Sequence, residues 1–204
     1  MGKTIYTIGH STQTVEAFIS LLKMHSINCV IDVRSMPFSQ FASQFNKNEL
    51  SYELKKEGIQ YIHMGEEFGA RREDESLYDD DGSLNFGKTI DSSLFKKGME
   101  RVFNGLKKGV TIALMCSEKE PSECHRCIMV GKAFDSIEDI DVENILEDGS
   151  LMSQDDISKM LVNKYFPQKG QITIFEMASG IEKTDEEYIS EAYKLREKEI
   201  AYHI

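Results

Sequence analysis

The sequence contains no apolar run of about 18 or more residues, so we expect no membrane-spanning helix. It also begins without an apolar leader segment, because Lys3 and Thr4 lead directly into a strand-like pattern. We therefore expect a cytoplasmic protein. We find neither internal repeats nor low-complexity tracts, and 204 residues are enough for one domain with a full core.

Positive charge is scarce in this chain. Its 24 Lys and Arg residues face 35 Asp and Glu residues, which gives a net charge of −11. A protein that grips a nucleic-acid backbone over a wide face is usually basic, so broad nucleic-acid binding is disfavoured. A local pocket of arginines remains compatible with a small anionic ligand. The four cysteines should be reduced in the cytoplasm.

Apolar runs of strand length alternate with helical patterns along the first three quarters of the chain. The runs cover residues 4–8, 28–33, 59–64, 110–115 and 142–146. Helical spacing of apolar residues lies between them, most clearly at 95–106. Regular alternation of this kind predicts an α/β fold, with a mostly parallel Rossmann-like sheet and helices on both faces.

We expect a single α/β core domain over residues 1–150 and a C-terminal extension over residues 151–204. The extension is more polar, and helical patterns at 155–162 and 185–200 predict that it is mostly helical, with one further strand at 172–175. It would dock on the core or on a partner subunit, which allows a homodimer. A long polar loop at 65–85 carries Arg71 and Arg72, and these would add to the affinity for anions if the loop folds over a cleft.

Two polar clusters follow the first two predicted strands. His10 and Ser11 come after the first strand, where Ser11 also suits a helix cap while His10 does not. Asp32, Arg34 and Ser35 end the second strand. Asp32 and Arg34 share a face of the strand, so they form either a structural ion pair or, through Arg34, an anion contact. In an α/β fold these strand ends border the ligand cleft.

The third cluster lies between the run at 110–115 and the apolar helical run that begins at 127. A thiol at a helix start has a lowered pKa, so Cys124 is our candidate nucleophile and His125 its base or orienting donor. Glu118 would act as general acid or base. Cys116 and Arg126 complete the site, and the Arg126 guanidinium would hold a phosphate, sulfate or carboxylate.

A metal site is the alternative for the same segment. Cys124 and Cys127 have C-x-x-C spacing, and Cys116 and His125 lie nearby, but a single C-x-x-C is a weak metal signal. Cys127 would also turn toward the sheet as a core residue. We therefore assign no metal ligand, and the sequence does not identify a cofactor.

Several of these motifs together resemble a bacterial and archaeal family called domain of unknown function 488. The resemblance runs in order across about residues 4–150. It is carried by residues 6–11, 32–37 and 44–46, by Cys116-x-Glu118 with Pro121, and by Cys124-His125-Arg126. It implies a compact α/β domain and supports the site, but it implies no particular reaction. Phe38 departs from the pattern, since many members carry a basic residue there.

The leading hypothesis is an enzyme, a hydrolase or transferase, that acts on a small anionic substrate resembling a nucleotide or nucleoside. Its cleft would lie at the carboxyl ends of the strands. Two alternatives come from other classes. One is a non-catalytic sensor or adaptor for a nucleotide-like ligand, and the other is a metal or redox protein centred on the cysteines and His125.

Overall fold

The computed structural model describes residues 2–169 and 183–204 of the chain. Six strands form one sheet in the order β3-β2-β4-β1-β5-β6. Their bounds are β1 Lys3–Gly9, β2 Cys29–Asp32, β3 Gln60–His63, β4 Ile112–Cys116, β5 Ile140–Ile145 and β6 Leu151–Ser153. All neighbouring pairs are parallel except β5 and β6. The predicted α/β fold with a mostly parallel sheet is thus confirmed.

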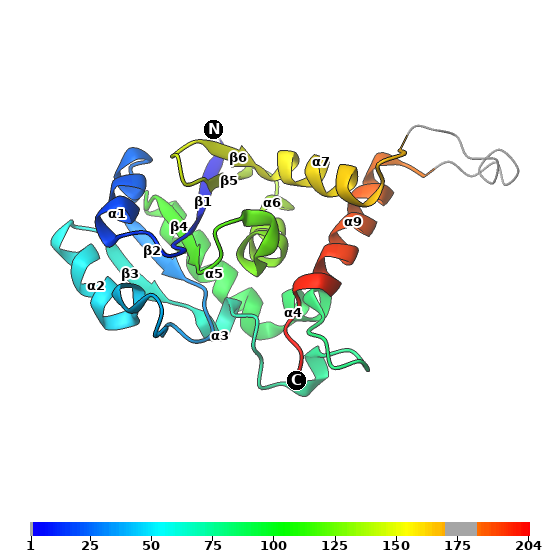
Figure 1. The fold of residues 1–204 in the computed structure, drawn as a ribbon, viewed down its shortest axis with the longest axis horizontal. Helices are drawn as coiled ribbons and strands as arrows, with labels where there is room; N and C mark the ends of the chain where they lie inside the picture. Colours follow the sequence, from blue (N-terminus) through cyan, green and yellow to red (C-terminus); the bar gives the residue numbers. More distant parts are fainter. Residues whose placement is uncertain (1, 170–182) are drawn as a thin grey trace, which may run out of the picture.

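Helices cover both faces of this sheet (Figure 1). Their bounds are α1 Val15–Met24, α2 Lys47–Lys56, α3 Gly65–Phe68, α4 Phe86–Asp91, α5 Ser93–Lys107, α6 Lys132–Asp135, α7 Gln154–Tyr165 and α9 Asp185–Ile200. Three short 3₁₀ turns lie at Ser43–Phe45, Glu75–Leu77 and Pro121–Glu123, and a π-helix spans Arg126–Gly131. No helix in the described part of the chain is long and apolar enough to cross a membrane.

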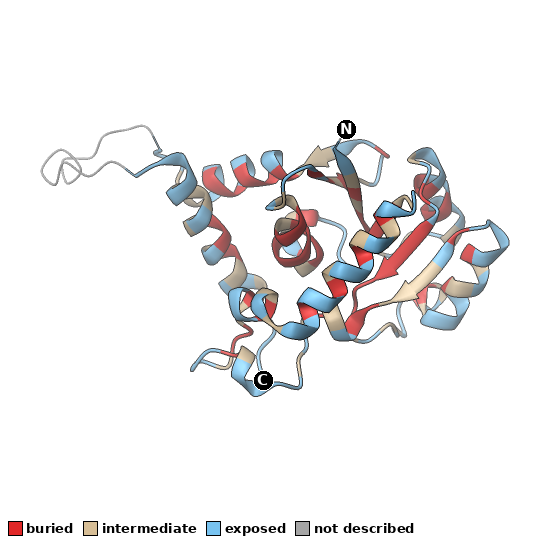
Figure 2. Cartoon of the chain, turned by 180° about the vertical axis from the view of Figure 1, so that it is seen from behind, coloured by how far each residue is buried: buried red, intermediate tan, exposed pale blue. Residues whose placement is uncertain are grey.

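The central strands are buried on both faces, as their uninterrupted apolar sequences require. Val30 and Leu114 are fully buried, and each lies on a different side of the sheet. One core packs beneath α1 and α2, while the other packs beneath α5, α6, α7 and α9. Figure 2 shows the buried residues along the central strands and on the inner faces of the helices. The central strands are thus packed by helices on both faces.

The chain after residue 150 joins the sheet before it turns helical. Strand β6 pairs antiparallel with β5, and a capping box at Ser153 then starts α7. Helix α9 packs on α7 and runs toward α4 (Figure 1). Beyond it, the Leu84 N–H donates to the Tyr202 carbonyl at 2.9 Å. The extension predicted to be mostly helical therefore also contributes a strand, and the strand expected at 172–175 lies outside the described residues.

The loop predicted at 65–85 contains short ordered elements instead of an open chain. It holds α3 and a 3₁₀ turn, and an isolated bridge joins Tyr78 to Leu84. The Tyr78 hydroxyl donates to the Arg72 carbonyl at 3.0 Å, which fastens the loop from within. Arg71 is thereby held in place near the carboxyl ends of the strands.

Candidate functional site

The carboxyl ends of β1, β2 and β4 lie side by side, with β4 in the middle. Parallel contacts continue past the strands, because the His10 N–H donates to the Cys116 carbonyl at 3.0 Å and the Val33 N–H donates to the Met115 carbonyl at 3.0 Å. The polar residues that follow these three strands are therefore gathered at one edge of the sheet.

The segment after β4 crosses directly over the end of β1. A Cβ atom on Gly9 would lie 1.9 Å from the Glu118 carbonyl oxygen, so this crossing requires glycine. The Arg126 guanidinium also holds this segment in place, because it donates hydrogen bonds to the carbonyls of Glu118 at 2.6 Å and Lys119 at 3.2 Å. These contacts fix the path of the segment and the position of the Glu118 side chain.

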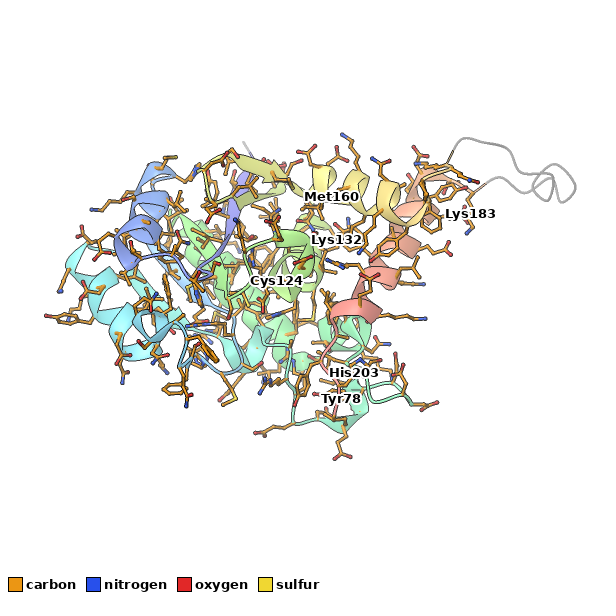
Figure 3. All side chains as sticks on the ribbon, viewed as in Figure 1. Tyr78, Cys124, Lys132, Met160, Lys183 and His203 are labelled. Carbon is orange, nitrogen blue, oxygen red and sulfur yellow. The ribbon has the colours of Figure 1, made fainter. Side chains whose placement is uncertain are left out.

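Two thiols, a carboxylate and an imidazole meet where this segment enters the π-helix. The Glu118 Oε2 atom lies 3.0 Å from the Cys116 Sγ and 2.9 Å from the Cys124 Sγ. The His125 Nδ1 atom lies 3.9 Å from the first sulfur and 4.0 Å from the second. The sequence placed these four residues in one site, and the structure brings them into contact. Figure 3 shows Cys124 near the centre of the molecule.

Burial and mutual charge set the protonation of this cluster. Burial of its carboxyl end and the neighbouring Cys124 raise the pKa of Glu118, although the residue as a whole is exposed at the surface. Burial alone would raise the pKa of Cys124, but its hydrogen bond with Cys116 and the charges of Arg126 and His125 bring it well below its ordinary value. Burial and Cys124 raise the pKa of Cys116. Of the two thiols, the surroundings thus favour the thiolate at Cys124.

Cys124 and His125 lie directly before a π-helix, a rare form that is frequent at functional sites. The Arg126 N–H points to the Cys124 sulfur at 3.4 Å. The His125 Nε2 atom lies 3.3 Å from the Val33 carbonyl, which orients the other ring nitrogen toward the sulfurs. Cys127 faces away from the cluster toward Gln154 and is fully buried.

A second network joins the residues predicted after β1 and β2. Arg34 makes a two-pronged ion pair with the fully buried Asp32, at 2.9 and 2.6 Å, and Tyr61 donates to the same carboxylate at 2.6 Å. The His10 Nε2 atom lies 2.9 Å from the Arg34 guanidinium. Burial and the Arg34 charge lower the pKa of His10 to about 4, so His10 is neutral and accepts this hydrogen bond.

A pocket of about 330 Å³ opens above the cluster. Of the residues predicted for the site, its walls include Arg34, Ser35, Cys116, Glu118, Cys124 and His125. His10, Ser11, Asp32 and Arg126 do not line it. The guanidinium of Arg126 points to the backbone beneath the pocket, so its predicted contact with an anion would need a different side-chain position.

Arg71 and Tyr202 also line the pocket. The sequence suggested Arg71 on the condition that its loop folds over the cleft, and it did not suggest Tyr202. The Arg71 guanidinium lies over the Tyr202 ring at 4.9 Å, and the Arg71 N–H donates to the Ser35 hydroxyl at 2.9 Å. Arg71 also borders an adjoining cavity of about 650 Å³. The Arg71-Arg72 pair was a visible signal in the sequence, whereas nothing in the sequence relates Tyr202 to Cys116.

The family of the chain follows from the segment that builds this site. Residues 14–132, more than half of the 204 residues, match the model described as domain of unknown function DUF488. The chain belongs to this family. No curated protein and no solved structure matches the chain. The resemblance noted from the motifs is thereby confirmed.

The match to the DUF488 model covers all four residues of the cluster, together with Arg34 and Arg71. It ends before β5, so α9 and the chain end that carries Tyr202 lie outside it. The floor of the pocket thus belongs to the DUF488 domain, and one wall comes from the C-terminal part of the chain.

Proposed function

We propose that this DUF488 protein is a cytoplasmic enzyme, a hydrolase or transferase, that acts on a small anionic substrate resembling a nucleotide or nucleoside. The observation that carries the proposal is the contact of two thiols, a carboxylate and an imidazole at the floor of a pocket with Arg71 on its wall. Structural packing does not require this combination of groups, and perturbed titratable groups in a cleft are characteristic of active sites.

Substrate binding falls to Arg71 and Tyr202 in this proposal. Arg71 is exposed and its side chain has no carboxylate partner among the ion pairs of the described residues. It is therefore free to pair with a phosphate or carboxylate of the substrate. The Tyr202 ring beside it offers an apolar surface for a planar base or sugar.

The chemistry falls to the cluster below. The raised pKa of Glu118 suits a group that accepts a proton and then returns it. Cys124, as the thiolate of the pair, can serve as nucleophile with His125 beside it. The four free cysteines of the described structure agree with a reducing compartment, which supports the cytoplasm.

The test is a binding and turnover screen with inorganic phosphate, pyrophosphate, sulfate, nucleotides and nucleosides. We expect at least one anion to raise the melting temperature of the wild type, and Arg71→Ala to weaken its binding at least tenfold, because one charge-assisted pair contributes about 1.5–3 kcal/mol. Lys55→Ala, which removes an exposed positive charge on α2, is the matched control and should bind normally.

Turnover separates an enzyme from a sensor. Glu118→Gln keeps the shape of the side chain and should abolish turnover while anion binding stays within a few-fold of the wild type. Saturable binding with no turnover of any bound compound would instead indicate a ligand sensor. If no anion binds, or if Arg71→Ala binds as well as the wild type, the assignment of the pocket fails.

A further inference from the structure

Cys116, Cys124 and His125 have the arrangement of metal ligands. Their sulfur and nitrogen donor atoms all lie within 4.8 Å of one another. In a tetrahedral zinc site, bonds of about 2.3 Å to sulfur and about 2.0 Å to nitrogen place these two atoms about 3.5 Å apart. The observed distances of 3.9 and 4.0 Å need only a small contraction.

The surroundings of His125 also fit a metal ligand. A metal-bound histidine usually donates its second ring N–H to a carboxylate or a backbone carbonyl, which fixes the ring and its tautomer. Here the Nδ1 atom faces both sulfurs while the Nε2 atom lies 3.3 Å from the Val33 carbonyl. A histidine that served only as base for Cys124 would not need to point equally at Cys116.

The charge around the cluster favours a divalent cation. Arg126 is fully buried, yet none of the ion pairs of the described residues includes it; its guanidinium donates to the carbonyls of Glu118 and Lys119, and Cys116 and Cys124 act on it electrostatically. A buried guanidinium needs a nearby negative charge. With a divalent cation bound, two thiolates, the Glu118 carboxylate, the cation and this guanidinium sum to zero, so the loaded cluster would be electrically neutral.

The geometry points to a zinc site in which Cys116, Cys124 and His125 are the ligands and the fourth position faces the pocket. Two cysteines and one histidine with an open position form a donor set of catalytic zinc sites. Glu118 lies beside both sulfurs but outside the compact group that includes the imidazole. It is therefore placed beside the metal as the proton-transfer group.

The zinc site rests on the proposed function for its substrate and deepens it: Cys124 becomes a metal ligand in place of the nucleophile, and hydrolysis is favoured over transfer. A zinc-bound water gives one proton to Glu118, and its oxygen forms a bond to the electrophilic atom of the substrate. The bond to the leaving group breaks, and Glu118 returns the proton to that group. Water is the only co-reactant. Nucleobase deaminases use zinc on two cysteines and a histidine with an adjacent glutamate in this way.

Metal content tests the inference directly. We expect the full-length protein, purified without a metal-affinity tag, to contain about one zinc ion per chain. Cys116→Ser, Cys124→Ser and His125→Ala should each lose it. Cys127→Ala is the matched control, because this thiol lies two residues after His125 but contacts Gln154, and it should keep the metal.

Cobalt binding keeps the inference testable if these variants fail to fold. Cobalt added to metal-free wild type should give the visible and sulfur-to-metal absorption of tetrahedral thiolate coordination, in a one-to-one titration. A wild type that contains no stoichiometric metal and shows no such absorption would overturn the zinc site.

Anion binding that depends on Arg71 but persists in metal-free protein would then leave the proposed function in place, with Cys124 as the nucleophile. Bound zinc without binding of any anion would support the zinc site and overturn the proposed function.

Discussion

The two buried arginines of this site, Arg34 and Arg126, have different roles because they have different partners. Arg34 forms an ion pair with Asp32 and also lines the pocket, so it both neutralises the buried carboxylate and forms part of the pocket wall. The Arg126 guanidinium donates to two backbone carbonyls, and its Nε atom is buried without a hydrogen-bond partner among the described residues. Arg126 therefore acts through the position of the Glu118 segment and through its charge.

His10 makes stability depend on pH. Its pKa of about 4 in the folded protein lies below the ordinary value of 6.5, so between these values the unfolded chain binds a proton that the folded protein does not. Stability should thus rise with pH through this window and be lost as the pH falls, by up to about 3 kcal/mol. Urea unfolding at pH 4–7 measures this dependence.

His10→Gln isolates the contribution of this residue, because an amide keeps an acceptor for Arg34 and does not titrate. Its stability should change less between pH 4 and 6.5 than that of the wild type. His203→Gln, at an exposed residue, is the matched control and should follow the wild type. Parallel curves for all three proteins would show that His10 is not the group responsible.

The elements of the fold were largely predictable, because the central strands are apolar on both faces and α5 has a clear amphipathic pattern. Strand β6 escaped prediction, since three residues in a polar segment carry no periodic signal and only pairing with β5 defines them. The π-helix escaped as well, because an apolar run such as residues 127–130 suits an α-helix equally.

Helix α9 is tied to the segment that carries Glu118 and Cys124. The buried Arg196 donates from Nε to the Ser122 carbonyl at 2.6 Å and lies 3.5 Å from the Glu123 carboxylate. Arg196→Ala should free this segment and lower stability by about 1–3 kcal/mol, the value of a hydrogen bond from a charged donor. Hydrogen exchange of the amides at 117–124 should become faster.

Lys194→Ala is the matched control for this experiment, since Lys194 is exposed on the same helix. It should leave both stability and exchange unchanged. If Arg196→Ala loses stability without faster exchange at 117–124, then α9 supports the core in general and not this segment.

At the scale of the whole molecule, only part of the site could be predicted from patterns in the sequence. The cluster itself was predictable, because Cys116 and Cys124 flank one strand-to-helix junction. The orientation of Arg126 was not, since a helix start does not reveal whether a side chain faces the cleft or the backbone beneath it. Tyr202 reaches the pocket only through the return of the chain end past α4.

The last residues of the sequence contact both the 78–84 loop and the wall of the pocket. The Ile204 N–H donates to the Gly82 carbonyl at 3.1 Å, and Tyr202 lies beside Arg71 on the pocket wall. Tyr78 and His203 lie close together in Figure 3, which shows where this end meets the 78–84 loop. Removal of residues 202–204 should therefore weaken two features at once, the backbone bonds and the contact with Arg71.

Point variants separate these two effects. Tyr202→Ala removes only the ring, so the affinity for the anion held by Arg71 should fall several-fold because a cation–π contact contributes about 0.5–1 kcal/mol. Stability should change little. Tyr202→Phe keeps the ring and should bind as the wild type does.

The truncation should reproduce the loss of affinity and also lower stability by about 1–2 kcal/mol through the lost hydrogen bonds. Equal affinities for the truncated and full chains would show that the pocket is complete within residues 2–201, and that the chain end only stabilises the fold.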